Sequence, residues 1–181
     1  MEKLIKRALQ GDKNAYISLI TSIQTDMYRV ANARLHDLDD INDAIQETIL
    51  KSYKQLHSLK EFSYFRTWII RILINECNQI YRRKQKQLGI FNKISKYDTV
   101  SSSLQNLQDV ENDIDFDILI NKLNYNERII LTLYYKNKYS ILEISDILNI
   151  SNNTVKSRLF RAKQKLKKLY EEGGLKYEAR K

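Results

Sequence analysis

Short polar side chains and cations gather near the C-terminus, at the start of a strongly basic segment. Asn152, Asn153 and Thr154 open this segment, and lysines and arginines follow at short intervals. An amide can pair with adenine through two hydrogen bonds, an arginine can pair in the same way with guanine, and a threonine methyl can contact thymine. We therefore predict a contact with duplex DNA, made by Asn152, Asn153, Thr154, Lys156, Ser157, Arg158 and Arg161.

Two helices and a tight turn must present these side chains. Apolar residues recur at helical spacing over residues 141–148, and the pattern breaks at 149–151, where Ser151 can cap a second helix through its hydroxyl. A short helix, a turn and a longer basic helix are the parts of a helix-turn-helix. A basic helix can also be merely a solvated face, so that alternative stays open. The apolar stripe of the second helix consists of Val155, Leu159, Ala162, Leu166 and Leu169.

A second group combines aromatic rings with cations and suggests a site for single-stranded nucleic acid. Bases stack on such rings while the cations follow the phosphates. Trp68 can instead fill the core of a helical bundle with its neighbour Phe65, whereas Phe62 and Tyr64 lie in or near a loop and are better placed for a base contact. The group consists of Phe62, Tyr64, Arg66, Trp68, Arg71, Arg82 and Arg83.

The composition favours an all-α protein that works by binding. The 181 residues include no proline and only four glycines, and the net charge of +9 favours a polyanion as partner. Cys77 is the only cysteine and lies in an apolar helical segment, so we expect a buried thiol and no internal disulfide. His36 and His57 have no third ligand at metal-binding spacing. We expect no catalytic residue, metal or cofactor, and the absence of a signal peptide or long apolar run predicts a cytoplasmic protein.

The helical patterns predict two small domains joined by an acidic flexible linker. We expect the first domain at 1–88, the linker at 89–117, the helix-turn-helix domain at 118–172 and a flexible tail at 173–181. Apolar stripes of the first domain include Ile41, Ile45, Ile49, Tyr53 and Leu56. Because an acidic cluster at 37–47 interrupts this basic chain, we expect at least two kinds of partner.

Several stretches in this order resemble one bacterial family, the sigma-70 RNA polymerase sigma factors of the extracytoplasmic-function (ECF) type. Residues 40–48, DINDAIQET, resemble the DAEDLVQETF stretch of that family. Residues 65–72, FRTWIIRI, followed by Asn75, resemble FRTWLYRIARN. Residues 154–162, TVKSRLFRA, resemble TVKSRLHRA. The family pattern differs at Asn42, where glutamate is usual, and at Gln79, where aspartate is usual.

The resemblance implies a sigma factor that binds core polymerase, directs it to promoters and promotes DNA melting. Asp40, Asp43, Gln46 and Glu47 would contact the clamp helices of the largest subunit. The aromatic and basic group, joined by Asn75, would contact the −10 element, and the basic helix would read the −35 element. The flap of the second-largest subunit and an anti-sigma factor, in some members membrane-anchored, are further expected partners.

Two other classes remain as alternatives. A conventional helix-turn-helix regulator would bind its duplex site without polymerase, but it would leave the QET helix and the aromatic group unexplained. A nucleic-acid enzyme or an RNA-binding protein would need a catalytic or RNA-reading motif, which the sequence does not offer.

Overall fold

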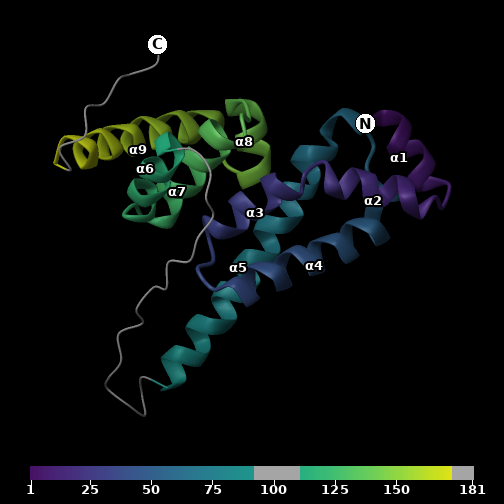
Figure 1. Cartoon of the computed structure of the whole chain (residues 1–181), viewed down its shortest axis with the longest axis horizontal. Helices are drawn as coiled ribbons and strands as arrows, with labels where there is room; N and C mark the ends of the chain where they lie inside the picture. The colour runs from purple at the N-terminus through teal and green to yellow at the C-terminus, as the bar shows by residue number, and fades with distance from the viewer. Residues whose placement is uncertain (92–110, 173–181) are drawn as a thin grey trace. The chain divides into compact units, whose positions relative to one another are not determined.

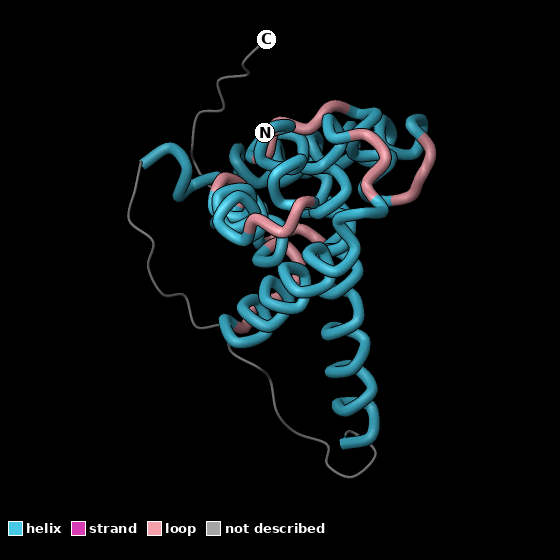
Figure 2. The backbone as a smooth tube through the Cα atoms, turned by 90° about the vertical axis from the view of Figure 1, so that its right-hand side faces the viewer, coloured by secondary structure: helices cyan, strands magenta, loops and turns pink. Residues whose placement is uncertain are grey.

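The computed structural model describes residues 1–91 and 111–172, and within them every regular element is a helix (Figures 1 and 2). The prediction of an all-α protein is therefore confirmed. The chain divides into two compact units, one built from α1 to α5 and the other mainly from α6 to α9. None of the helices in the described ranges is both long and apolar enough to cross a membrane. The expected tail at 173–181 and residues 92–110 of the expected linker lie outside the described residues.

The first unit is a bundle of five α-helices. They are α1 (Glu2–Leu9), α2 (Lys13–Thr21), α3 (Gln24–Asn32), α4 (Leu38–Gln55) and α5 (Phe65–Phe91), with single 3-10 turns at Leu56–Ser58 and Phe62–Tyr64 between the last two. Asp12 caps α2 as its side chain accepts a hydrogen bond from the amide of Ala15, and Asp37 caps α4 in the same way. The buried core includes Ile5, Leu19, Met27, Phe65, Ile69 and Leu73.

The buried face of α4 differs from the predicted stripe. Ile41 is buried, but Ile45 and Ile49 are half-buried and Tyr53 is 42% exposed. Small residues take their place: Ala44, Thr48 and Ser52 are the other buried residues of this helix. Their hydroxyls are satisfied locally, because Thr48 Oγ1 donates to the carbonyl of Ala44 at 2.7 Å and Ser52 Oγ lies 2.8 Å from the hydroxyl of Tyr16. Apolar periodicity therefore identified the helix but placed its inner face wrongly.

The second unit contains the helix-turn-helix. Its elements are α6 (Glu111–Asn121), α7 (Tyr125–Leu131) continued by a π-turn at Thr132–Lys136, α8 (Ile141–Leu148) and α9 (Asn152–Glu172). α6 begins seven residues before the predicted start of the domain at 118.

The turn between α8 and α9 is fixed at both ends. Asn149 ends α8 in the left-handed conformation, with φ 51° and ψ 51°, which asparagine adopts more readily than most residues. Ser151 then caps α9, as its Oγ accepts from the amide of Thr154 at 3.2 Å, so the predicted cap is confirmed. Ser140 and Glu143 form a capping box at the start of α8. The predicted stripe is also confirmed over most of α9: Val155, Leu159, Ala162 and Leu166 are buried and Leu169 is half-buried.

Candidate nucleic-acid interface

The residues predicted to read duplex DNA occupy the first half of α9, but they do not share one face. Asn153, Lys156, Ser157 and Arg161 are exposed, whereas Thr154 and Arg158 are half-buried at the flank of the helix. Asn152 is half-buried and its Oδ1 is enclosed by protein. This amide oxygen is therefore not available to a ligand.

Hydrogen bonds within α9 hold several of these side chains against their own helix. The Oγ1 of Thr154 lies 2.8 Å from the Oγ of Ser151, and Ser157 Oγ donates to the carbonyl of Thr154 at 3.0 Å. Arg161 Nε donates to the carbonyl of Ser157 at 3.3 Å. These bonds fix the side chains near the helix axis and still leave the remaining guanidinium nitrogens of Arg161 on an exposed residue.

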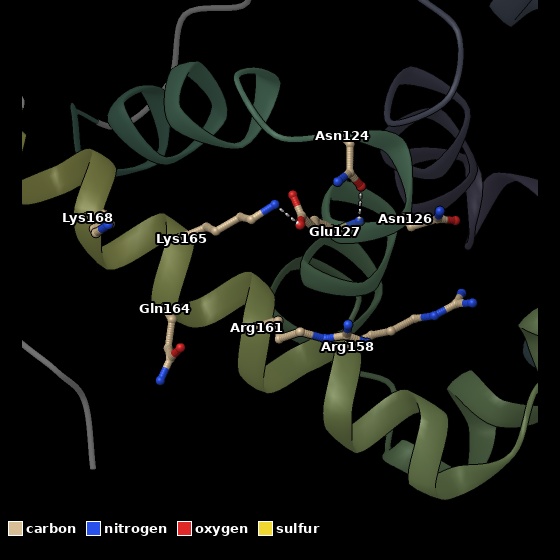
Figure 3. Close-up of a pocket in the computed structure, with 8 residues that line it drawn as sticks. All are labelled: Asn124, Asn126, Glu127, Arg158, Arg161, Gln164, Lys165 and Lys168. Carbon is tan, nitrogen blue, oxygen red and sulfur yellow. Dashed lines mark hydrogen bonds and ion pairs between the residues drawn. The ribbon is translucent and has the colours of Figure 1, made fainter.

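A cationic groove runs along the flank of α9, where it faces the start of α7 (Figure 3). Its volume is about 640 Å³. Figure 3 shows Lys165 reaching from α9 to the carboxylate of Glu127 on α7, to which it is ion-paired. The groove is lined by Asn124, Asn126, Glu127, Arg158, Arg161, Gln164, Lys165 and Lys168. With four cations and one paired carboxylate, it can hold anionic groups such as phosphates.

Six of the eight residues that line this groove lie outside the set predicted to contact DNA. Asn124 and Asn126 come from the start of α7, some thirty residues before α9. Asn124 is also the cap of α7, because its Oδ1 accepts from the amide of Glu127 at 3.1 Å. The only sequence signal was the polar run NYN before an apolar stretch, which predicts a helix start rather than a binding site.

The aromatic residues of the first unit are partly available at the 3-10 turn before α5. Tyr64 is 54% exposed, Phe62 is half-buried, and Phe65 is fully buried. Trp68 is half-buried, and its ring centroid lies 6.1 Å from that of Phe65. Tyr64 is thus the ring that most readily accepts a stacked base, while Trp68 divides its surface between the core and solvent.

The polar residues of α5 fall into two sets. One set lies within an arc of about 60° at 3.6 residues per turn and consists of Arg71, Asn75 and Arg82 together with the ring of Trp68. The three polar residues of this set are exposed. Arg66 lies outside that arc, and its guanidinium is 2.5 Å from the carboxylate of Asp26 on α3. Arg83 is exposed but also lies outside the arc. A strand lying along the arc would therefore meet one ring, one amide and two guanidinium groups.

The acidic residues of α4 form an exposed face that we call the acidic face, made of Asp43, Gln46, Glu47 and two apolar residues, Leu50 and Tyr53. Leu50 is 54% exposed, and its position among charged groups was not predicted. Asp40 lies at the edge of this face and is half-buried. Its Oδ2 is 2.5 Å from Lys84 Nζ on α5, and this hydrogen bond raises the pKa of Lys84.

Comparison with family models gives two matches in the order of the two units. Residues 19–87 match the model described as Sigma-70 region 2, and residues 115–166 match that described as Sigma-70, region 4. The first range contains the acidic face and the aromatic residues, and the second contains α8, most of α9 and every groove residue except Lys168.

Among curated proteins, the chain is similar to ECF sigma factors over most of its length. It is 31% identical over 153 residues to ECF RNA polymerase sigma factor SigM of Bacillus subtilis, covering 82% of this chain and 90% of the relative. It is 26% identical over 180 residues to SigW of the same organism, covering 93% and 95%.

Solved structures share the fold. RpoE of Bartonella quintana, solved with the anti-sigma factor NepR, matches with a TM-score of 0.71 at 20% identity over 86% of this chain and 96% of that one. CnrH, solved with the cytosolic domain of CnrY, matches with a TM-score of 0.67 at 20% identity over 93% and 96%.

Proposed function

The chain belongs to the sigma-70 family of RNA polymerase sigma factors, in the ECF group, and from this premise we propose how its surfaces divide the work of initiation. As an ECF sigma factor it binds core polymerase, directs it to promoters through −35 and −10 elements, and promotes melting. The assignment of each step to particular residues is our proposal.

The observation that carries the proposal is the separation of charge within one small basic protein. A chain with a net charge of +9 keeps an exposed acidic face on α4, while cations and aromatic rings lie on α5 and cations cover α9. Nucleic acid alone would not favour an acidic face, whereas a basic protein surface would. Two different partners, polymerase and DNA, account for both.

The acidic face binds the clamp helices of the largest polymerase subunit. Asp43, Gln46 and Glu47 supply charge and hydrogen bonds, and Leu50 supplies apolar contact at the centre of the face. Asp40 is held by Lys84 and contributes at the edge. Complementary charge orients the encounter, and desolvation of Leu50 slows dissociation. The second unit contacts the flap of the second-largest subunit.

The turn before α5 captures a base of the non-template −10 strand. Tyr64, with Phe62 and Trp68 nearby, provides the stacking surface, and Arg71, Asn75 and Arg82 hold the strand along α5. Removing a base from the duplex stack costs a few kcal/mol, and stacking on a ring offsets part of that cost. Melting therefore becomes dependent on sequence. Arg66 and Arg83 contact phosphates at the margins of this site.

α9 lies in the major groove of the −35 element. The exposed residues Asn153, Lys156, Ser157 and Arg161 face the DNA, and the half-buried Asn152, Thr154 and Arg158 lie at the margins. The groove beside α7 holds phosphates of the adjoining backbone. The chain performs no bond-forming step itself, since polymerase carries out catalysis, and it works in the cytoplasm.

An anti-sigma factor is a further proposed partner. RpoE and CnrH, which share this fold, were solved with such a factor and with a cytosolic domain, respectively. A protein of this class would block the acidic face or the DNA-binding surfaces and so keep the chain from polymerase.

Run-off transcription tests the proposal directly. Core polymerase, with and without the chain, is given a library of genomic promoters. We expect discrete start sites only when the chain is present, with shared −35 and −10 sequences upstream. A chain that binds duplex DNA tightly alone and yields no start sites would be a conventional regulator, contrary to the proposal.

A further inference from the structure

Phe160 is the most exposed aromatic residue of α9 and lies outside the set predicted to contact DNA. Its side chain is 61% exposed, although it sits in the middle of a helix with a well-formed buried stripe. A single exposed apolar residue is common on protein surfaces and needs no explanation by itself. Phe160 differs from such a residue because of its position on the helix.

Phe160 belongs to an exposed stripe that runs opposite the buried one. Asn153, Ser157, Phe160 and Gln164 are all exposed and follow the spacing i, i+4, i+7 and i+11. At 3.6 residues per turn they lie within an arc of about 60° and extend over about 16 Å of helix. In Figure 3 the side chain of Gln164 points away from α7. We call this the neutral stripe, because none of its four members carries a charge.

Cations border the neutral stripe on both sides. Lys156 and Lys167 lie along one edge, and Arg161 and Lys168 lie along the other. A major groove has the same arrangement, with base edges in the middle and a phosphate backbone on each side. The match places the neutral stripe over the base edges and the cations over the two backbones.

A phenyl ring among the base edges has one favourable partner. The edges of guanine, cytosine and adenine present hydrogen-bond donors and acceptors, whereas thymine also presents its C5-methyl group. Phenylalanine can neither donate nor accept, so it gains from contact with the methyl and loses where it desolvates a polar edge. Resting on the proposed function of α9, we propose that Phe160 contacts a thymine methyl in the −35 element and selects for thymine at that position.

The test replaces individual thymines by uracil, which removes only the methyl group. Core polymerase with the full chain first transcribes a promoter library whose −35 region is randomised, which identifies the preferred thymines. Templates with thymine or uracil at one such position then compete in one reaction. With the wild-type chain we expect about a fourfold preference for thymine at one or two adjacent positions, the value of burying one methyl group.

Variants at Phe160 should remove that preference and no other. With Phe160→Ala the thymine-to-uracil ratio should fall to near one at those positions, and with Phe160→Leu it should stay intermediate. Leu142→Ala is the matched control, because Leu142 is a 66% exposed apolar residue of α8 outside the stripe, and it should behave as wild type. The thermal unfolding midpoint of each variant should be unchanged, since neither side chain is buried.

Two results would overturn the proposal. A thymine-to-uracil ratio that Phe160→Ala leaves unchanged would exclude the methyl contact. An equal loss of transcription from every library member would assign the ring to a protein surface instead. A wild-type library with no base preference at −35 is a different outcome, because it would contradict the proposed function of α9 itself.

Discussion

Lys51 Nζ on α4 lies 2.6 Å from Oε2 of Glu76 on α5, a carboxylate whose side chain is only 6% exposed. Gln79 donates to the other oxygen of Glu76 at 3.4 Å. The side chain of Lys51 is 37% exposed, so the pair is buried at the glutamate end and reaches solvent at the lysine end. It joins the two longest helices of the first unit.

Removing the cation from this pair should destabilise the first unit. Lys51→Met leaves a buried carboxylate without a counter-ion, and we expect a loss of about 2–3 kcal/mol in the free energy of unfolding, less than for a fully buried pair because Lys51 reaches solvent. Trp68, the only tryptophan, lies on α5, so its fluorescence in a urea titration follows this unit. The double variant Lys51→Met, Glu76→Leu should recover most of the loss, and losses that simply add would contradict the pairing.

Charge reversal on the acidic face should weaken polymerase binding. Asp43→Lys or Glu47→Lys places a cation where the proposed partner surface is basic, and we expect affinity for core to fall on the order of tenfold. Competition against a labelled sigma factor measures it. Glu2→Lys changes the net charge equally at an exposed site on α1 and is the control. An equal effect of the control would mean that only the net charge matters.

Loss of the exposed ring at the turn before α5 should slow promoter opening. With Tyr64→Ala we expect opening to slow by about 5- to 150-fold, equivalent to the about 1–3 kcal/mol of one stacked base. Permanganate reactivity of thymines in the −10 region follows opening directly. Tyr64→Phe keeps the ring and should behave nearly as wild type. If both variants fail alike, the hydroxyl rather than stacking is responsible.

Neutralising the groove beside α7 should change the salt dependence of DNA binding. Lys168→Gln should lower the slope of log affinity against log salt by about 1, without altering base preference. Lys13→Gln, at an exposed position of α2, should leave the slope unchanged.

Arg158→Ala and Arg161→Ala should weaken −35 use while core binding stays intact. A loss of core binding in either arginine variant would contradict the division between the two units.

Cys77 should make stability depend on alkaline pH. Burial raises the pKa of its thiol from 9.0 to about 12, so the unfolded chain ionises first as pH rises. The contribution of the thiol is full below the unfolded pKa and is lost between about pH 9 and about pH 12. Relative to Cys77→Ala, the wild type should lose about 1.4 kcal/mol of unfolding free energy by about pH 10. Urea titrations of both chains at about pH 8 and about pH 10 measure this difference.

Local signals explain why the helix-turn-helix could be predicted closely. Ser151 and the stripe from Val155 to Leu166 act within a few residues of each other, and the structure has the predicted cap and buried side. The same holds for Cys77, whose burial followed from its apolar helix. Capping and amphipathicity are properties of short segments, so one sequence carries them.

Contacts between segments that are distant in the sequence limit what could be predicted from the sequence alone. Ser52 faces inward, where its hydroxyl meets that of Tyr16 on α2, and Thr48 is buried with its hydroxyl bonded to the carbonyl of Ala44. Ile45 and Ile49 are only half-buried, although their hydrophobicity predicted the inner position. The pairing of Arg66 with Asp26 joins residues forty positions apart. The groove beside α9 likewise needs α7. No periodicity in a single segment reveals which side chains from another element will meet it.

The two opposite faces of α9 are under different evolutionary constraints. Val155, Leu159, Ala162 and Leu166 are buried in the core, while Asn153, Ser157, Phe160 and Gln164 on the other face are exposed. Mutations on the outer face therefore escape the stability threshold that purges most changes to a core. Descendants of a duplicated copy of this chain can drift to new promoters one outer residue at a time, each intermediate still folded and still able to join polymerase.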